Sequence, residues 1–107
     1  IAMVLQEAGW FERIPIEIHG GDASRSAIGR ARQAVYRERS FRALPPDLRE
    51  RYFMPQAGGM TPVPTLARRI SSWSVINLLD AGQMAGVAPA PLVFCRNAFI
   101  YFSPEAV

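Results

Sequence analysis

The sequence predicts an α/β domain built on a parallel sheet. The expected elements at its start run helix, strand, helix, which is the order of a βαβ-type sheet protein. The run Leu92-Val93-Phe94-Cys95 is continuously apolar, as expected of a strand buried on both faces of a parallel sheet. Half of the 107 residues are hydrophobic, which favours a globular chain over a disordered one.

The first expected elements are a helix end and a short strand. Apolar residues at helical spacing in residues 1–8 indicate the last turns of an amphipathic helix, with Gly9 as its stop. Residues 14–19 alternate apolar and other side chains and predict a strand. This strand is expected to run into a glycine turn at residues 20–22.

Two helices should follow. Ser24 or Ser26 is placed to cap a helix that runs to about Tyr36. A break at Leu44-Pro45-Pro46 precedes a second short helix, from Asp47 to about Phe53. The buried stripe of the longer helix is predicted to consist of Ala27, Ile28, Ala31, Ala34 and Val35.

The rest of the chain alternates expected loops and strands. Residues 54–64 are rich in Pro and Gly and predict a loop, as do residues 81–91. Residues 69–76 are a candidate strand. Ser103-Pro104-Glu105 has the cap, the proline and the acid that begin a helix.

The charge and the cysteine content of the sequence favour some classes of function over others. All 12 basic residues are arginine, the net charge is +3, and acids are interspersed among them, which favours a solvated helix surface over a nucleic-acid site. Cys95 is the single cysteine and is expected to be a buried, inert thiol. One cysteine cannot form a disulfide within the chain, which fits a reducing compartment. His19 has no second ligand at metal-binding spacing, and no apolar stretch could span a membrane.

Polar residues after the expected strands are candidates for a binding site. In open parallel sheets, ligands bind beyond the carboxyl ends of the strands. Asp22 could accept hydrogen bonds from both ribose hydroxyls of a nucleotide, or it could be a turn residue; its position alone leaves these readings equal. Asn77 and Leu78 suit the edge and the face of a flat base. Arg96 and Asn97 could reach a carboxylate, a ribose or a purine edge, or they could be an arginine that holds a helix end and an asparagine in a turn; their position after the expected strand favours the binding role slightly.

Several motifs, taken together in this order, resemble the catalytic domain of CheR-type chemotaxis methyltransferases. The string F-C-R-N-x-x-I-Y-F at residues 94–102 is the most specific of them. The resemblance covers essentially the whole chain, 1–107. The other matching segments are Gly21-Asp22, Arg30-Ala31-Arg32, Val35-Tyr36, Leu44-Pro45-Pro46, Arg51-Tyr52-Phe53 and Asn77-Leu78-Leu79.

The resemblance implies a Rossmann-like fold that binds S-adenosylmethionine. It implies a cytoplasmic signal-transduction transferase that methylates glutamate side chains of chemoreceptors, with no nucleic-acid partner and no insertion into the membrane. Asp22 matches the ribose-binding acid of the family, and Asn77 with Leu78 matches the adenine-side pair. Arg96 and Asn97 match the cofactor-binding pair at the end of the fourth strand. Arg96 is also expected to act in catalysis, with Tyr101, which resembles a tyrosine lining the methyl-transfer site.

The resemblance also predicts how the chain is organised. Residues from about 41 to 72 correspond to a small inserted β-subdomain, which in some members docks a receptor peptide. The chain looks like the middle of a catalytic domain that lacks the glycine-rich first motif, so it is expected to be inactive alone. The family usually has an acid before the fourth strand, where this chain has Ala90-Pro91-Leu92. That departure motivates an alternative: a degenerate, non-catalytic domain that binds only cofactor or partners.

Overall fold

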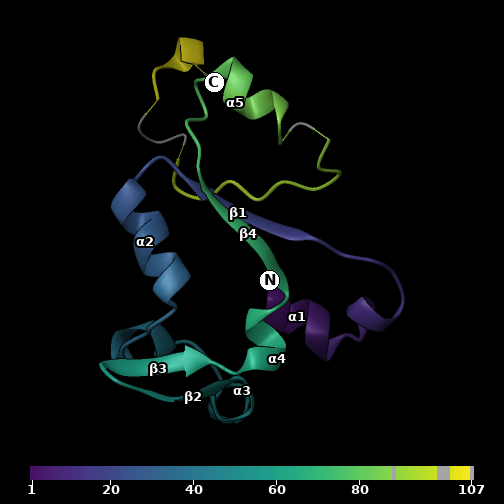
Figure 1. Cartoon of the computed structure of the whole chain (residues 1–107), viewed down its shortest axis with the longest axis vertical. Coiled ribbons are helices and arrows are strands. Elements are labelled where there is room, and N and C mark those ends of the chain that lie inside the picture. The colour runs from purple at the N-terminus through teal and green to yellow at the C-terminus, as the bar shows by residue number, and fades with distance from the viewer. Residues whose placement is uncertain (88, 99–101, 107) are drawn as a thin grey trace. The chain divides into compact units, whose positions relative to one another are not determined.

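The computed structural model describes residues 1–87, 89–98 and 102–106. The chain divides into two compact units, Ile1–Val75 and Ile76–Val107. The first unit holds most of the secondary structure, including a parallel strand pair and an antiparallel hairpin (Figure 1). The parallel pair agrees with the predicted α/β class, although two strands alone do not define a Rossmann-like sheet.

The first element is helix α1, Ala2–Glu7, as the apolar spacing predicts. Gly9 follows with φ +71°, a left-handed conformation that glycine adopts without strain, and turns the chain into the 3₁₀ helix η1, Trp10–Glu12. Arg69, which comes much later in the sequence, contacts this segment with its side chain. Its guanidinium lies 4.2 Å from the ring centre of Phe11, and its Nε donates to Gln6 Oε1 at 3.0 Å.

Strands β1, Ile18–Asp22, and β4, Ile70–Val75, form the parallel sheet. The prediction of a strand over residues 69–76 is confirmed. The first strand was predicted four residues too early, and the expected glycine turn is in fact part of β1. The reason lies in the partner strand, because the ring of Trp73 covers Gly20 so closely that a Cβ there would lie 2.1 Å from Trp73 Cζ3.

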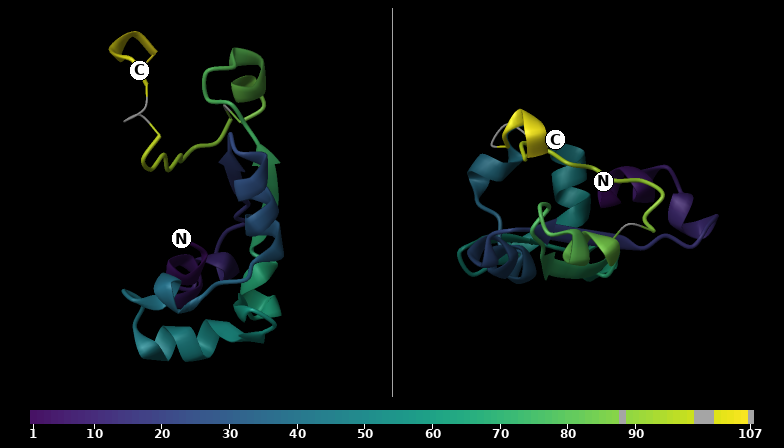
Figure 2. Two further views of the ribbon diagram at one scale, coloured as in Figure 1. Left: turned by 90° about the vertical axis from the view of Figure 1, so that its left-hand side faces the viewer. Right: turned by 90° about the horizontal axis from the view of Figure 1, so that it is seen from above.

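Helix α2, Arg25–Gln33, packs beside this strand pair (Figure 2). Ser24 is its N-cap, as predicted, and the hydroxyl of Ser24 accepts a hydrogen bond from Ala27 N. Of the predicted buried stripe, Ile28 is buried at 2% exposure and Ala27, Ala31 and Ala34 are partly buried, whereas Val35 is 38% exposed and its predicted burial is wrong. The helix ends three residues earlier than expected, because Ala34 turns left-handed at φ +53°.

A small antiparallel element replaces the predicted loop at residues 54–64. Strands β2, Phe53–Gln56, and β3, Gly59–Pro62, form a hairpin. On its other side, β3 exchanges two backbone hydrogen bonds with Tyr36, through Met60. The glycines that helped to predict a loop form the tight turn, Gly58 and Gly59 both with positive φ, whereas Pro55 and Pro62 lie within the strands. The hairpin lies within the range 41–72 of the inserted subdomain, whose boundaries stay a prediction.

Short helices surround the hairpin. The 3₁₀ helix η2 spans Glu38–Phe41, helix α3 spans Pro46–Tyr52, and helix α4 spans Pro64–Ala67. The predicted helix from Asp47 to Phe53 is therefore confirmed, with a shift of one residue. Three buried side chains form a core here: Phe41, Tyr52 and Leu66, each at 6–7% exposure.

The second unit contains helix α5, Ala81–Ala85, and the 3₁₀ helix η4, Pro104–Ala106. Helix α5 falls where a loop was predicted, and η4 begins at the predicted cap. The predicted strand of residues 92–95 is wrong: the segment is irregular, and Leu92, Val93 and Phe94 are each about 70% exposed. An apolar run becomes a buried strand only where neighbouring strands pair with it, and no pairing is found for it among the described residues.

Cys95 in this segment is exposed, so the expectation of a buried thiol is also wrong. Burial of that thiol was inferred from the predicted strand and fails with it. None of the described helices has the length and apolar character needed to cross a membrane.

Candidate functional site

The carboxyl end of the parallel strand pair carries the first candidate residue. Asp22 is the last residue of β1, and its register partner is Val75, the last residue of β4. Because the strands are parallel, both carboxyl ends open onto the same edge of the sheet. This is the edge at which open α/β sheets bind their ligands.

The carboxylate of Asp22 is exposed and held in one orientation. Its Oδ1 accepts a hydrogen bond from Ser24 N at 2.7 Å, while Ser24 itself caps α2. No hydrogen bond to Oδ2 and no ion pair of Asp22 is found in the described ranges. One oxygen is therefore used for orientation, and the carboxylate retains acceptor capacity for the vicinal hydroxyls of a ribose.

A second set of candidates begins at Asn77. Its Oδ1 accepts from Leu79 N at 3.0 Å, which closes a turn, and its backbone N donates to Gln83 Oε1 at 2.9 Å. Leu78 is 38% exposed between these two contacts. An exposed amide beside an exposed leucine has the chemistry to contact the edge and the face of a purine.

Helix α5 starts immediately after this turn. Asp80 is its N-cap, and its Oδ1 accepts from Gln83 N at 3.0 Å. Its Oδ2 accepts from Gln83 Nε2 at 2.9 Å. The hydrogen bond from the backbone of Gln83 is the largest of the contacts that lower the pKa of Asp80. Gln83 was missed in the sequence, although an acid followed three residues later by glutamine is a recognisable capping pattern.

Arg96 and Asn97 lie in the irregular segment of the second unit, and both are exposed. Asn97 has a left-handed backbone, with φ +60°, which asparagine tolerates better than most residues. Tyr101 lies outside the described residues. Asp22 belongs to the first unit and the other predicted site residues to the second. A joint site for them therefore stays a prediction.

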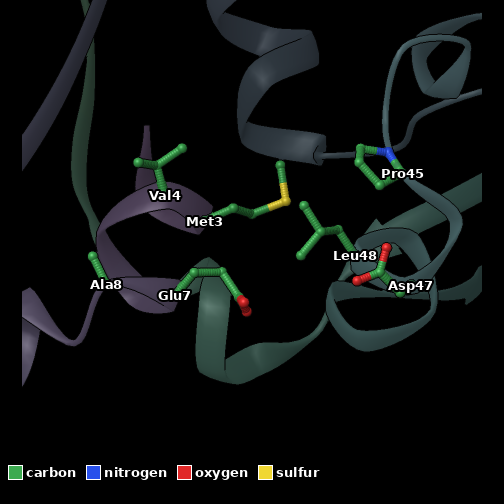
Figure 3. Close-up of a pocket in the computed structure, with 7 residues that line it drawn as sticks. All are labelled: Met3, Val4, Glu7, Ala8, Pro45, Asp47 and Leu48. Carbon is green, nitrogen blue, oxygen red and sulfur yellow. The ribbon is translucent and has the colours of Figure 1, made fainter.

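A hollow of the first unit lies elsewhere, between α1 and α3 (Figure 3). It is an open groove of about 520 Å³, with Met3, Val4 and Leu48 among its apolar walls. Glu7 lines it and accepts hydrogen bonds from Arg51, at 2.5 Å, and from the hydroxyl of Tyr52. These two contacts, that from Arg51 foremost, lower the pKa of Glu7. None of the predicted cofactor-binding residues lies in this groove.

Comparison with known proteins identifies related sequences. A family model described as the SAM-binding domain of CheR methyltransferases matches residues 1–106. The "Probable biofilm formation methyltransferase WspC" of Pseudomonas aeruginosa is 39% identical over 95% of this chain and 24% of its own length. "Chemotaxis protein methyltransferase 2" of the same organism is 37% identical, over 95% of this chain and 37% of its own length. "Chemotaxis protein methyltransferase" of Escherichia coli is 30% identical, over 80% and 31%.

Proposed function

This chain belongs to the CheR methyltransferase family, and we propose from that premise that its protein methylates glutamate side chains of chemoreceptors, producing glutamate methyl esters. The cofactor is S-adenosylmethionine, as the matching SAM-binding domain indicates. The chain spans 24% to 37% of the length of the relatives named above. The activity proposed here is accordingly that of the whole protein.

One observation carries the proposal: an acid ends β1 at the carboxyl edge of a parallel strand pair. Asp22 stands there with an exposed carboxylate that has a fixed orientation and no cationic partner among the described residues. Such a group fits the two hydroxyls of the cofactor ribose, because a carboxylate accepts hydrogen bonds and cannot donate them when ionised.

The remaining cofactor contacts are assigned to the other predicted residues. Asn77 and Leu78 would hold the adenine ring, the amide at its edge and the leucine on its face. Arg96 and Asn97 would contribute further polar contacts to the bound cofactor. Their exposure in the second unit leaves these side chains accessible to a ligand.

The reaction needs orientation more than activation. S-adenosylmethionine supplies, when bound, a methyl group already activated on a sulfonium. The receptor glutamate is ionised at neutral pH and is already nucleophilic. The protein must hold the carboxylate in line and exclude water. We assign Arg96 to positioning and charge pairing, because arginine stays protonated and cannot act as a general base. We place Tyr101 at the transfer site, on the resemblance of its motif.

The proposed partners are methyl-accepting receptor proteins, and the proposed location of the reaction is the cytoplasm. The printed names of the relatives include both chemotaxis and biofilm-formation methyltransferases. Both kinds of name fit an enzyme of signal transduction.

Methyl transfer by the full-length protein tests the proposal. The protein is incubated with receptor-containing membranes and S-adenosylmethionine labelled in the methyl group. A glutamate methyl ester releases its label as volatile methanol on treatment with base, whereas a methylated amine does not. We expect base-labile label on the receptor, and its loss in a receptor whose acceptor glutamates are replaced by alanine. Cofactor binding without any transfer would refute the enzymatic proposal and support the non-catalytic alternative.

A further inference from the structure

Several hydrogen bonds hold the turn at residues 77–83, and the side chain of Gln83 makes two of them. The side-chain amide of Gln83 makes two hydrogen bonds, one as an acceptor and one as a donor. Its Oε1 accepts from the backbone of Asn77, and its Nε2 donates to Asp80 Oδ2, both at 2.9 Å. Its own backbone N donates to the other oxygen of Asp80 at 3.0 Å. Gln83 thus ties the start of the turn to the start of α5.

This arrangement departs from an ordinary capping box. In a capping box, the glutamine three residues after the cap reaches back to the backbone N–H of the cap residue itself. Here it passes Asp80 and reaches Asn77, three residues further upstream. The carboxylate of Asp80 supports this reach, because it accepts a hydrogen bond from Nε2 while Oε1 faces Asn77.

These hydrogen bonds affect which atom of the Asn77 side chain is available to a ligand. Its Oδ1 is already used by Leu79 N, so its Nδ2 is the group left for a ligand, and no partner for Nδ2 is found in the described residues. The direction of Nδ2 depends on the backbone of Asn77. That backbone is held at its N–H by Gln83 Oε1 and at its carbonyl by Asp80 N, which donates to it at 3.0 Å.

We propose that Gln83 is a positioning residue for the cofactor, acting through Asn77 by fixing the backbone from which that amide points. This inference rests on the proposed role of Asn77 at the adenine. Gln83 itself touches no ligand in this scheme. Its contribution is preorganisation: without its two side-chain hydrogen bonds the turn would be less ordered before the cofactor binds, and binding would be weaker.

The test measures binding of S-adenosylhomocysteine to the full-length protein by calorimetry. Gln83→Met keeps the length of the side chain and removes both of its hydrogen bonds. We expect roughly three- to tenfold weaker binding, from the loss of hydrogen bonds of ordinary net strength. Gln33→Met is the matched control: Gln33 is exposed at the end of α2, its side chain makes none of the hydrogen bonds found, and its replacement should leave binding unchanged.

A double-mutant cycle separates positioning from general stabilisation. If Gln83 acts through the Asn77 amide, then Gln83→Met in an Asn77→Ala background should change affinity by less than about twofold. An equal loss in both backgrounds would overturn the inference, as would unchanged affinity for Gln83→Met alone. Should Gln83→Met fail to fold, Asp80→Ser retains a capping hydroxyl but removes the oxygen that orients Gln83 Nε2. That variant should show a smaller loss with the same coupling to Asn77, and a loss without coupling would again refute the role.

The cycle also distinguishes this inference from the function on which it rests. If Asn77→Ala and Asp22→Ala both leave cofactor affinity unchanged, the assignment of the site is wrong. If Asn77→Ala weakens binding and Gln83→Met does not, the site stands and only the positioning role of Gln83 fails.

Discussion

Replacing Gly20 with alanine should destabilise the domain, because Trp73 occupies the space that a side chain would need. A Cβ on Gly20 would lie 2.1 Å from Cζ3 and 2.2 Å from Cε3 of the indole ring. Carbon atoms pack best at about 3.5–4.0 Å, so the ring would have to move by more than about 1 Å. Overpacking of this kind costs typically 1–3 kcal/mol, and we expect about 1–2 kcal/mol because Trp73 is only half-buried.

Thermal and urea unfolding of the full-length protein would measure this loss, with an expected fall in Tm of roughly 2–8 °C. Gly29→Ala is the matched control. Gly29 lies inside α2, and a Cβ there would meet nothing within 4 Å, so alanine should stabilise the helix by about 0.5–1 kcal/mol. The same chemical change should thus have opposite signs at the two glycines.

A second background identifies the cause. In a Trp73→Val background, the indole atoms nearest to Gly20 are gone, and Gly20→Ala should cost less than about 0.5 kcal/mol. An undiminished loss there would show that the indole contact is not responsible. Wild-type stability of the single variant would refute the reasoning altogether.

Three further predictions concern pH, backbone conformation and catalysis. Hydrogen bonds, that from Arg51 foremost, lower the pKa of Glu7 in the folded state below its ordinary value of 4.5. The stabilisation that Glu7 contributes should therefore be present above pH 4.5 and lost as the pH falls through the folded-state pKa. In a Glu7→Gln variant, the midpoint of urea unfolding should depend less on pH over that acid range. Ala34→Gly should raise the free energy of unfolding by about 0.5–1 kcal/mol, since Ala34 has φ +53°, and an unchanged or lower value would contradict the cap geometry. Arg96→Ala should lower the methylation rate by roughly an order of magnitude or more with little change in Tm, and Tyr101→Phe should affect turnover more than cofactor affinity; a loss of Tm with intact activity would count against both roles.

Local signals in the sequence predicted the elements that local interactions determine. Ser24 was a recognisable cap, and it caps α2. The strand that became β4 and the helix that became α3 had clear patterns and clear breaks. Asp22 was expected in a glycine turn just after a strand, and it is instead the last residue of β1.

Interactions between distant segments account for what could not be predicted. Gly20 reads as a turn residue until the indole of Trp73 is known to cover it. Residues 54–64 read as a loop because of their proline and glycine content, although they pair locally as a hairpin, to which Tyr36 adds a bridge from upstream. The opposite error occurred at Phe94, where apolar composition predicted burial and the segment is exposed. An apolar composition shows that burial of a strand would be favourable, but it does not show which neighbouring strand would bury it.

The candidate site shows the same difference between what local signals predict and what contacts between residues determine. The motifs pointed to Asp22 and Asn77 individually, and the structure adds the hydrogen bonds that orient each of them. Gln83 was overlooked because a glutamine in an expected loop had no assigned partner. Its role depends on two contacts, with Asn77 and Asp80, that become visible only once α5 is recognised as a helix.

The affinity of the full-length protein for S-adenosylhomocysteine, compared between wild type, Asp22→Ala and Asp47→Ala, tests the central claim most directly. Both aspartates are exposed carboxylates, but Asp47 lies in the first turn of α3, away from the carboxyl edge of the sheet. If Asp22 holds the ribose, its replacement should weaken binding at least tenfold, because each charge-assisted hydrogen bond contributes about 1.5–3 kcal/mol. Asp47→Ala should leave affinity unchanged. Equal affinities for wild type and a folded Asp22→Ala variant would contradict the account and reduce Asp22 to a turn residue.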